Sequence, residues 1–226
     1  MKTDNTLGLK VHQHLISIGM ETPMDRSDVS DLATLNGKEW KIEQIEGAMQ
    51  HIMQVLGLDL ADDSLHDTPK RFAKMYVNEL FKGLDYNNFP KCTVIDNKMD
   101  AGMVVEKNVK VMSNCEHHFV TIDGVATIAY IPGAKVIGLS KINRIVDFFA
   151  RRPQVQERLT NQIWHTLSFI LGTEDVAVYI DAVHFCVRSR GVEDANSSTV
   201  TSKLGGVFMH SPDTRAEFMA IARSSK

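Results

Sequence analysis

The sequence contains a short run of residue types that bind metals, Cys115-Glu116-His117-His118. Thiols, imidazoles and carboxylates are the ligands that Zn²⁺ uses in proteins, and three protein ligands with one open position make a catalytic site. Cys115 and His118 are three residues apart, so one tight loop can bring both to the same ion. The spacing does not separate His117 from His118, and neighbouring histidines also occur by chance, so this run alone does not establish a metal site.

A second cluster, Val183-His184-Phe185-Cys186-Val187, alternates between apolar residues and possible ligands. Alternation predicts a strand, in which His184 and Cys186 project from the same face. From there, 71 residues after Cys115, the two side chains could reach Cys115 and His118 across a sheet. The alternative is that Cys186 is a small buried hydrophobe and His184 a hydrogen-bonded core histidine. Because two clusters of ligand types occur, we favour a metal site.

Basic side chains stand close in sequence to these clusters and at the starts of predicted helices. The free N–H groups and the dipole at a helix start attract anions. The alternative is an ordinary solvated helix end. Because the chain as a whole is slightly acidic, cations placed beside metal candidates indicate a polyanionic substrate, and a phosphorylated small molecule fits best. The residues concerned are Ser140, Lys141, Arg144, Arg188, Arg190, Lys70 and Arg71.

Gln156-Glu157 begins another predicted helix. A glutamate in a first helical turn normally just interacts favourably with the dipole. A carboxylate can instead accept paired hydrogen bonds from the N1–H and the exocyclic amine of guanine. The spacing alone favours the first interpretation.

The elements that must position these residues follow from apolar periodicity. Spacings of three and four predict helices, period-two alternation predicts strands, and Asp123-Gly124 predicts a two-residue hairpin turn. The polar stretch 21–37 is predicted to be a linker. Helices are expected over 7–18, 42–56, 68–83, 142–152, 155–170 and 213–223, and strands over 104–112, 118–131, 176–187 and 199–208.

This order predicts an α+β fold: an antiparallel sheet with two helices on one face, preceded by an N-terminal helical region. We place the helical region at residues 1–95 and the catalytic domain at 96–226. The other face of the sheet is expected to be uncovered, which usually means self-association.

Composition excludes several classes of protein. The 226 residues carry a formal net charge of −3, unlike the strongly basic footprint of a general nucleic-acid binder. Three cysteines cannot form a disulfide framework and fit a reducing compartment. The longest apolar runs have five residues, too few for a membrane span, and the N-terminus lacks the apolar stretch of a secretory signal. A cytoplasmic protein that binds neither nucleic acid nor membrane is expected. There is also no phosphate loop of the GxxxxGK[ST] kind, no GxGxxG after a strand and no HExxH.

Several long motifs, in order, resemble the GTP cyclohydrolase I family in its bacterial form, the zinc enzymes that open folate synthesis. The resemblance runs from about Glu43 to the C-terminus. It rests on Cys115-Glu116-His117-His118-Phe119, Gly138-Leu139-Ser140-Lys141-Ile142-Asn143-Arg144, Arg152-Pro153-Gln154-Val155-Gln156-Glu157-Arg158 and Asp181-Ala182-Val183-His184.

The resemblance implies the tunnelling fold, in which subunits join their sheets into a barrel, two pentamers stack into a homodecamer, and active sites lie between subunits. It implies Zn²⁺ held by Cys115, His118 and Cys186, with His117 and His184 taking part in the chemistry. It also implies hydrolysis of GTP at C8, with release of formate and formation of 7,8-dihydroneopterin triphosphate. The substrate-binding residues implied are Ser140, Lys141, Arg144, Gln156, Glu157, Arg190 and, from a neighbouring subunit, Arg71.

Two other functions compete. A non-catalytic nucleotide-binding or scaffold protein would use a closed structural zinc site, with His184 as the fourth ligand. A related tunnelling-fold enzyme would act on another pterin or purine.

Overall fold

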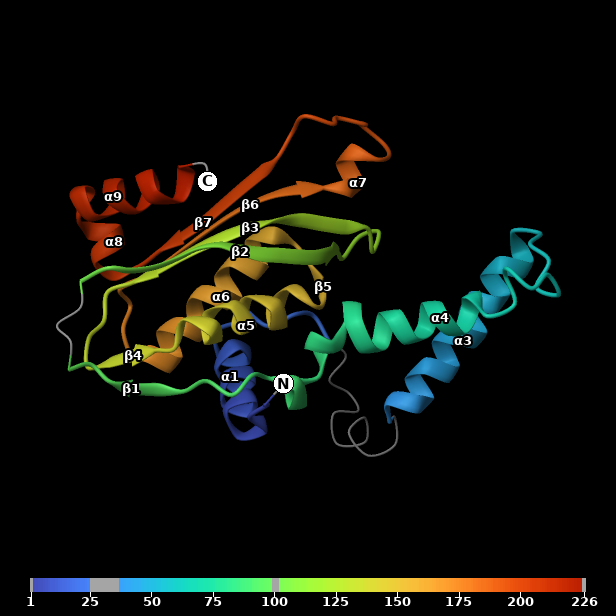
Figure 1. Cartoon of the computed structure of the whole chain (residues 1–226), viewed down its shortest axis with the longest axis horizontal. Coiled ribbons are helices and arrows are strands. Elements are labelled where there is room, and N and C mark those ends of the chain that lie inside the picture. Colours follow the sequence, from blue (N-terminus) through green and yellow to red (C-terminus); the bar gives the residue numbers. More distant parts are fainter. Residues whose placement is uncertain (1, 25–36, 99–101, 225–226) are drawn as a thin grey trace. The chain divides into compact units, whose positions relative to one another are not determined.

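Figure 1 shows the computed structural model of the chain, which describes residues 2–24, 37–98 and 102–224. Contacts divide the chain into two compact units, one of Met1–Thr22 with Gly83–Lys226 and one of Pro23–Lys82. The functional boundary that we place at residue 95 stays a prediction.

A five-stranded sheet is the centre of the larger unit. The strands lie in the order β5-β2-β3-β6-β7; the four longer ones are antiparallel, and β5 pairs in parallel with the end of β2. This sheet and its helices confirm the predicted α+β class. The strands are β2 (Val104–Cys115), β3 (Thr121–Tyr130), β5 (Pro153–Gln154), β6 (Val176–His184) and β7 (Thr199–Leu204).

Two helices, α5 (Leu139–Ala150) and α6 (Gln156–Leu171), cover one face of the sheet, as predicted (Figure 1). Their apolar sides supply much of the core, and α6 ends at Gly172, whose left-handed φ of 68° suits glycine. Helix α1 (Asn5–Ser17) also packs on this core and is capped by Asp4, whose carboxylate accepts from the Leu7 N–H.

The other face of the sheet is not fully uncovered, and our expectation was wrong at one end. There the chain turns back after β7 into α8 (Gly206–His210) and α9 (Pro212–Arg223) (Figure 1). Phe208 and Phe218 are fully buried in a second small core with Ala129, Ala177 and Tyr179. The predicted strand 199–208 therefore ends at Leu204.

The Asp123-Gly124 pair is not a hairpin turn, contrary to the prediction. Both residues lie inside β3 and pair with β2 on one side and β6 on the other. Glycine is required here by close approach, because a Cβ on Gly124 would lie 2.2 Å from the Asp181 carbonyl oxygen of β6. The turn between β2 and β3 comes earlier, directly after Cys115.

A small separate sheet precedes α5 and was not predicted. It pairs β1 (Val94–Asp96) with β4 (Lys135–Ile137) in antiparallel fashion. Because β4 runs into α5 after one residue, this sheet fixes where α5 begins.

Residues 25–36 of the predicted linker lie outside the described residues, but its first two residues are buried. Glu21 and Thr22 are 8% and 4% exposed. The Glu21 carboxylate pairs at 3.0 Å with Arg152, whose side chain is completely buried, and also accepts from Tyr86. A buried guanidinium needs a counter-charge, and Glu21 supplies it from 131 residues away.

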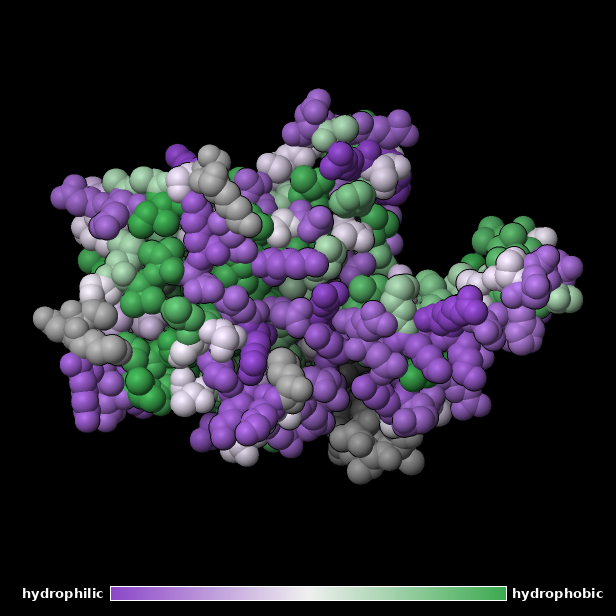
Figure 2. Space-filling model, in the orientation of Figure 1, coloured by the Kyte–Doolittle hydropathy of each residue, from purple (hydrophilic) through white to green (hydrophobic). Residues whose placement is uncertain are grey.

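The smaller unit contains α3 (Lys38–Val55) and α4 (Thr68–Met75), which continues as a π-helical turn, Tyr76–Leu80. Figure 2 shows apolar surface on this unit. Val55, Leu56 and Leu58, at and just after the end of α3, are exposed. Within the described ranges, no helix is both long and apolar enough to cross a membrane.

Candidate active site

The loop from Cys115 to Val120 is a tight turn that closes the β2–β3 hairpin. The Cys115 N–H donates to the Val120 carbonyl at 2.8 Å, and the Phe119 N–H donates to the Cys115 carbonyl at 2.8 Å. Phe119 has a left-handed φ of 55°, and the Asn114 side-chain amide donates to its carbonyl at 3.0 Å. The turn buries Cys115 and leaves His117 and His118 exposed.

Two further contacts attach this loop to neighbouring elements. The Glu116 N–H donates to the Gln154 carbonyl of β5 at 3.0 Å. The Glu116 carboxylate receives two hydrogen bonds, at 2.5 and 3.4 Å, from the Arg158 guanidinium in the first turns of α6. The loop is therefore attached both to the sheet and to α6.

Cys186 does not lie on a strand beside His184, which corrects our prediction. β6 ends at His184, whose partner across the sheet is Ile122, and the next residues form a helical turn, α7 (Phe185–Arg188). The turn nevertheless brings Cys186 against Cys115. Burial and the hydrogen bond with the Cys115 thiol both raise the pKa of Cys186.

The two histidines of the loop point to different partners. His117 Nδ1 lies 3.6 Å from Cys115 Sγ, whereas His118 Nε2 lies 3.0 Å from the Arg190 guanidinium. In the described part of the chain, no group of three or more His, Cys, Asp and Glu side chains is arranged to hold a metal ion. The structure thus places Cys186 and His117 each next to Cys115, and the choice of His118 as a ligand stays a prediction.

His184, Gln156 and Glu157 meet where β6 ends and α6 begins. Gln156 is 1% exposed, and its Oε1 lies 2.8 Å from His184 Nε2. Burial lowers the pKa of His184, and the exposed carboxylate of Glu157 partly opposes this. The sequence placed all three near the site but gave no sign of the contact between Gln156 and His184, because 28 residues separate them.

The predicted anion-binding residues at the start of α5 lie away from the cysteines of the same chain. α5 is 12 residues and about 18 Å long; it begins after β4, and its other end precedes β5, which pairs with Cys115. Lys141 and Arg144 instead lie near Cys92, where they oppose the burial that raises the pKa of Cys92 to about 11. Ser140 is exposed at the same helix start.

Of the other predicted cations, Arg190 lies at the site through its contact with His118. Arg71 belongs to the smaller unit, where it is exposed and pairs with Asp67 at 3.2 Å.

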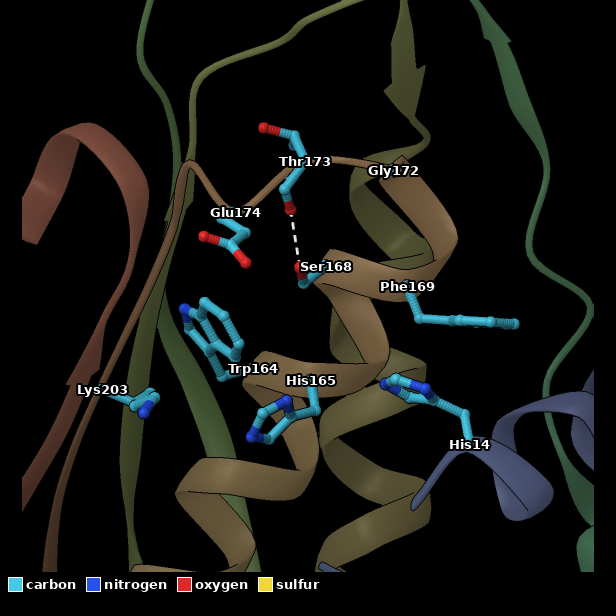
Figure 3. A pocket seen from close by; sticks show the side chains of 9 residues that line it. All are labelled: His14, Trp164, His165, Ser168, Phe169, Gly172, Thr173, Glu174 and Lys203. Carbon is cyan, nitrogen blue, oxygen red and sulfur yellow. Dashed lines mark hydrogen bonds between the residues drawn. The ribbon is translucent and has the colours of Figure 1, made fainter. Parts of the chain in front are cut away.

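A cavity of about 440 Å³ lies elsewhere, between α1, the C-terminal half of α6 and β7 (Figure 3). His14 and Phe169, which both line it, stack with ring centroids 4.8 Å apart, and the Ser168 hydroxyl donates to the Thr173 carbonyl at 2.7 Å. None of the predicted site residues lines it. The candidate site is instead the cluster at one end of the sheet, where β2 and β6 end.

Two thiols, neighbouring imidazoles and an exposed carboxylate gather where β2 and β6 end and α6 begins, and these are residue types that hydrolytic zinc enzymes use. The family model described as GTP cyclohydrolase I matches residues 45–223. The chain belongs to the GTP cyclohydrolase I family and is a hydrolase of cyclic amidines.

Bacterial relatives match almost the whole chain. The protein named GTP cyclohydrolase 1 from Aeromonas hydrophila is 60% identical over 213 residues, which cover 94% of each chain. The proteins of that name from Aeromonas salmonicida and Enterobacter sp. strain 638 are 60% and 58% identical over 212 and 214 residues. The similarity therefore includes the N-terminal region, beyond the segment that the family model matches.

Proposed function

We propose that this enzyme is a zinc-dependent GTP cyclohydrolase I, which hydrolyses GTP at C8, releases formate and forms 7,8-dihydroneopterin triphosphate for folate and pterin synthesis. The observation that carries the proposal is the contact between Cys115 and Cys186, which are 71 residues apart, with His117 and His184 on the adjoining loop and strand. Family membership supplies the reaction and the substrate.

The donor set fits zinc, because two thiols lie in contact and imidazoles adjoin them. Cys115, Cys186 and His118 would hold the ion, and His118 would exchange its contact with Arg190 for the metal. Zn²⁺, when bound, acts as a Lewis acid that activates water near neutral pH.

The protein's own side chains would orient the substrate and move protons. Glu157, exposed in the first turn of α6, would accept hydrogen bonds from the N1–H and the amine of guanine. The family resemblance also assigns Gln156 to guanine recognition. Its buried side chain would stabilise the start of α6 from the protein interior. His184 would deliver protons, because an imidazole can gain and lose a proton near neutral pH. His117, beside Cys115, would be a second proton carrier.

The triphosphate would be held by cations from more than one copy of the chain. Arg190 lies at the thiol cluster, but the start of α5, with Ser140, Lys141 and Arg144, lies a helix length away in the same chain. A neighbouring copy would bring its α5 to this cluster, and Arg71 would join in the same way. This separation supports the proposal that active sites lie between subunits.

A ring of subunits with the tunnelling fold would meet this need. The edge strand β7 is largely exposed at its start, and exposed apolar side chains lie on the unit of α3 and α4. We therefore propose a homo-oligomer, a decamer of two stacked pentamers. The three free cysteines fit the reducing cytoplasm, where we place the enzyme.

The test is to incubate the purified protein with GTP and assay formate and, after oxidation, pterin fluorescence. Formate together with a fluorescent pterin is the expected result. Binding of GTP without turnover would favour a nucleotide-binding scaffold, and turnover of another pterin or purine alone would favour a related enzyme.

A further inference from the structure

Gln156 is hydrogen-bonded through both ends of its side-chain amide. Its Nε2 lies 2.8 Å from the Thr199 carbonyl oxygen, 3.2 Å from the Ile180 carbonyl oxygen and 3.1 Å from Thr201 Oγ1. Its Oε1 lies 2.8 Å from His184 Nε2. These partners come from β6 and β7, so the amide joins the start of α6 to the end of the sheet.

The partners fix which way the amide points. Carbonyl oxygens only accept hydrogen bonds, so the atom that faces Ile180 and Thr199 must be the NH₂ group. The hydroxyls agree with this orientation. Thr160 donates to the Gln156 carbonyl at 2.8 Å, so its lone pair can accept from Thr201 at 2.7 Å. Thr201 then has a lone pair left for the Gln156 NH₂ group.

The orientation of the amide decides the tautomer of His184. The NH₂ end of the amide donates to residues of β6 and β7, so the oxygen end faces His184. An amide oxygen only accepts hydrogen bonds, so His184 Nε2 must carry the hydrogen of that bond. The neutral ring then has its lone pair on Nδ1. Nothing in the described ranges is hydrogen-bonded to Nδ1, so this atom is free to exchange a proton.

We propose that Gln156 is a positioning residue for His184: it holds the ring in place with the hydrogen on Nε2 and leaves Nδ1 as the proton-exchanging atom. The inference rests on the proposed function, in which His184 moves protons. In this inference Gln156 acts on the reaction by orienting the imidazole of His184 and does not contact guanine directly. The Gln156 side chain is buried, its NH₂ group faces the sheet and its oxygen faces His184, so the geometry supports the first role.

A double-mutant cycle tests this relation. Gln156→Met removes the amide at nearly constant volume, and it is made in the native chain and in His184→Ala. We expect Gln156→Met alone to lower kcat for formate release by about 10–100-fold, the loss typical when the orienting partner of an imidazole is removed, with little change in KM. In the His184→Ala background it should cause no further loss. An equal loss in both backgrounds, or a raised KM with unchanged kcat, would overturn the proposal.

Gln162→Met is the matched control. Gln162 is also a fully buried glutamine of α6, and it is hydrogen-bonded to Met20, Thr22 and Gln154 rather than to His184. We expect this variant to lower thermal stability and to leave kcat unchanged. If Gln162→Met lost as much kcat as Gln156→Met, then removing either buried amide of α6 would have the same effect. That result would contradict the proposal.

A measurement without turnover separates this inference from the proposed function. Nitrogen NMR of the ¹⁵N-histidine-labelled protein reports the tautomer, and the His184 signal is identified by its loss in His184→Ala. We expect hydrogen on Nε2 in the native chain and a mixture of tautomers in Gln156→Met. Hydrogen on Nδ1 in the native chain would overturn the inference whatever the activity. Failure of the native protein to release formate would overturn the proposed function and leave the tautomer result standing.

Discussion

Glu116 and Arg158 form an ion pair with N–O distances of 2.5 and 3.4 Å that joins the loop of Cys115 to the helix that begins with Gln156 and Glu157. The two side chains are 25% and 20% exposed, so water screens the pair only in part. The pair thereby sets the distance between the proposed metal ligands and the proposed guanine-binding residue.

Breaking this pair should loosen the loop more than it destabilises the fold. We expect Arg158→Met to lower the free energy of unfolding by about 1 kcal/mol and to weaken zinc binding by about 10-fold. Zinc titration and urea unfolding measure the two effects. Exchanging the charges in Glu116→Arg with Arg158→Glu should recover part of the zinc affinity. Unchanged zinc affinity in Arg158→Met would contradict this role.

Cys186 and His184 should fail in different ways when replaced. Cys186→Ser removes a thiolate ligand, so zinc should be lost and the reaction should stop. His184→Ala should keep about one zinc per subunit, while product formation falls by roughly 10²–10⁴-fold, the usual contribution of a positioned acid–base group. Metal analysis and rapid-quench product analysis decide between the roles. Loss of zinc from His184→Ala with zinc retained in Cys186→Ser would reverse them.

The start of α5 should contribute to binding GTP without affecting the metal. We expect Lys141→Ala or Arg144→Ala to weaken GTP binding by roughly 1.5–3 kcal/mol per lost charge-assisted bond, with unchanged zinc content. Equilibrium binding and metal analysis are the measurements. Native GTP affinity in both variants would remove this helix from the site.

Mixing two impaired variants tests whether sites are shared between copies. Lys141→Ala weakens GTP binding and Cys186→Ser removes a proposed metal ligand, so subunits exchanged by mild dissociation and reassociation should form some intact sites. At a GTP concentration too low to saturate Lys141→Ala, we expect the mixture to be more active than either variant alone. No recovery, in oligomers shown to contain both chains, would place both groups in one chain.

In the metal-free protein, one pair of cysteines should be susceptible to oxidation. Cys115 and Cys186 are in contact, so air oxidation of the metal-free protein should join them and abolish activity until reductant and zinc are added. Cys92 is the control, because burial raises its pKa to about 11 and keeps it a thiol at neutral pH. Peptide mapping identifies the disulfide. Activity in the oxidised, metal-free protein would contradict the zinc assignment.

The buried pair of Glu21 and Arg152 should make stability depend on acidity. Burial alone raises the pKa of Glu21, but the hydrogen bond from His12, the charge of Arg152 and the hydrogen bond from Tyr86 outweigh it and lower the pKa below its ordinary value of 4.5. Ionised Glu21 therefore stabilises the fold fully above that pH, and this contribution is lost as the pH falls through the lower folded-state pKa.

Glu21→Gln should remove that dependence. We expect a loss of about 3–5 kcal/mol near pH 7, because Arg152 is left buried without its counter-charge, and a smaller further loss on acidification than in the native chain. Urea unfolding between about pH 3 and pH 7 measures both. Asp147→Asn, which breaks the more exposed pair with Arg151, is the control and should cost no more than about 0.5 kcal/mol. The same pH dependence in Glu21→Gln as in the native chain would disprove the assignment.

Local patterns in the sequence predicted the principal helices and strands because burial of an apolar face leaves a period that can be read along the chain. The stripe of α6 and its end at Gly172 are examples, as are the alternating strands β2 and β6. The same local reasoning failed at Asp123-Gly124. A short pair of residues suits a turn as well as a strand, and only the approach of β6 shows why a glycine is there.

Chemistry-bearing residue types, and the motifs shared with a family, also determined the class of enzyme from the sequence alone. Tertiary structure decided which of these residues meet. Cys186 reaches Cys115 from a helical turn and not from the predicted strand, His117 rather than His118 lies next to Cys115, and Gln156 faces His184. Glu21, in a stretch that reads as linker, is the counter-charge of Arg152. Each of these contacts joins residues whose relative position depends on strand register and on how the chain turns at the end of an element. These properties arise from packing across the whole core, so no local pattern of residues records them.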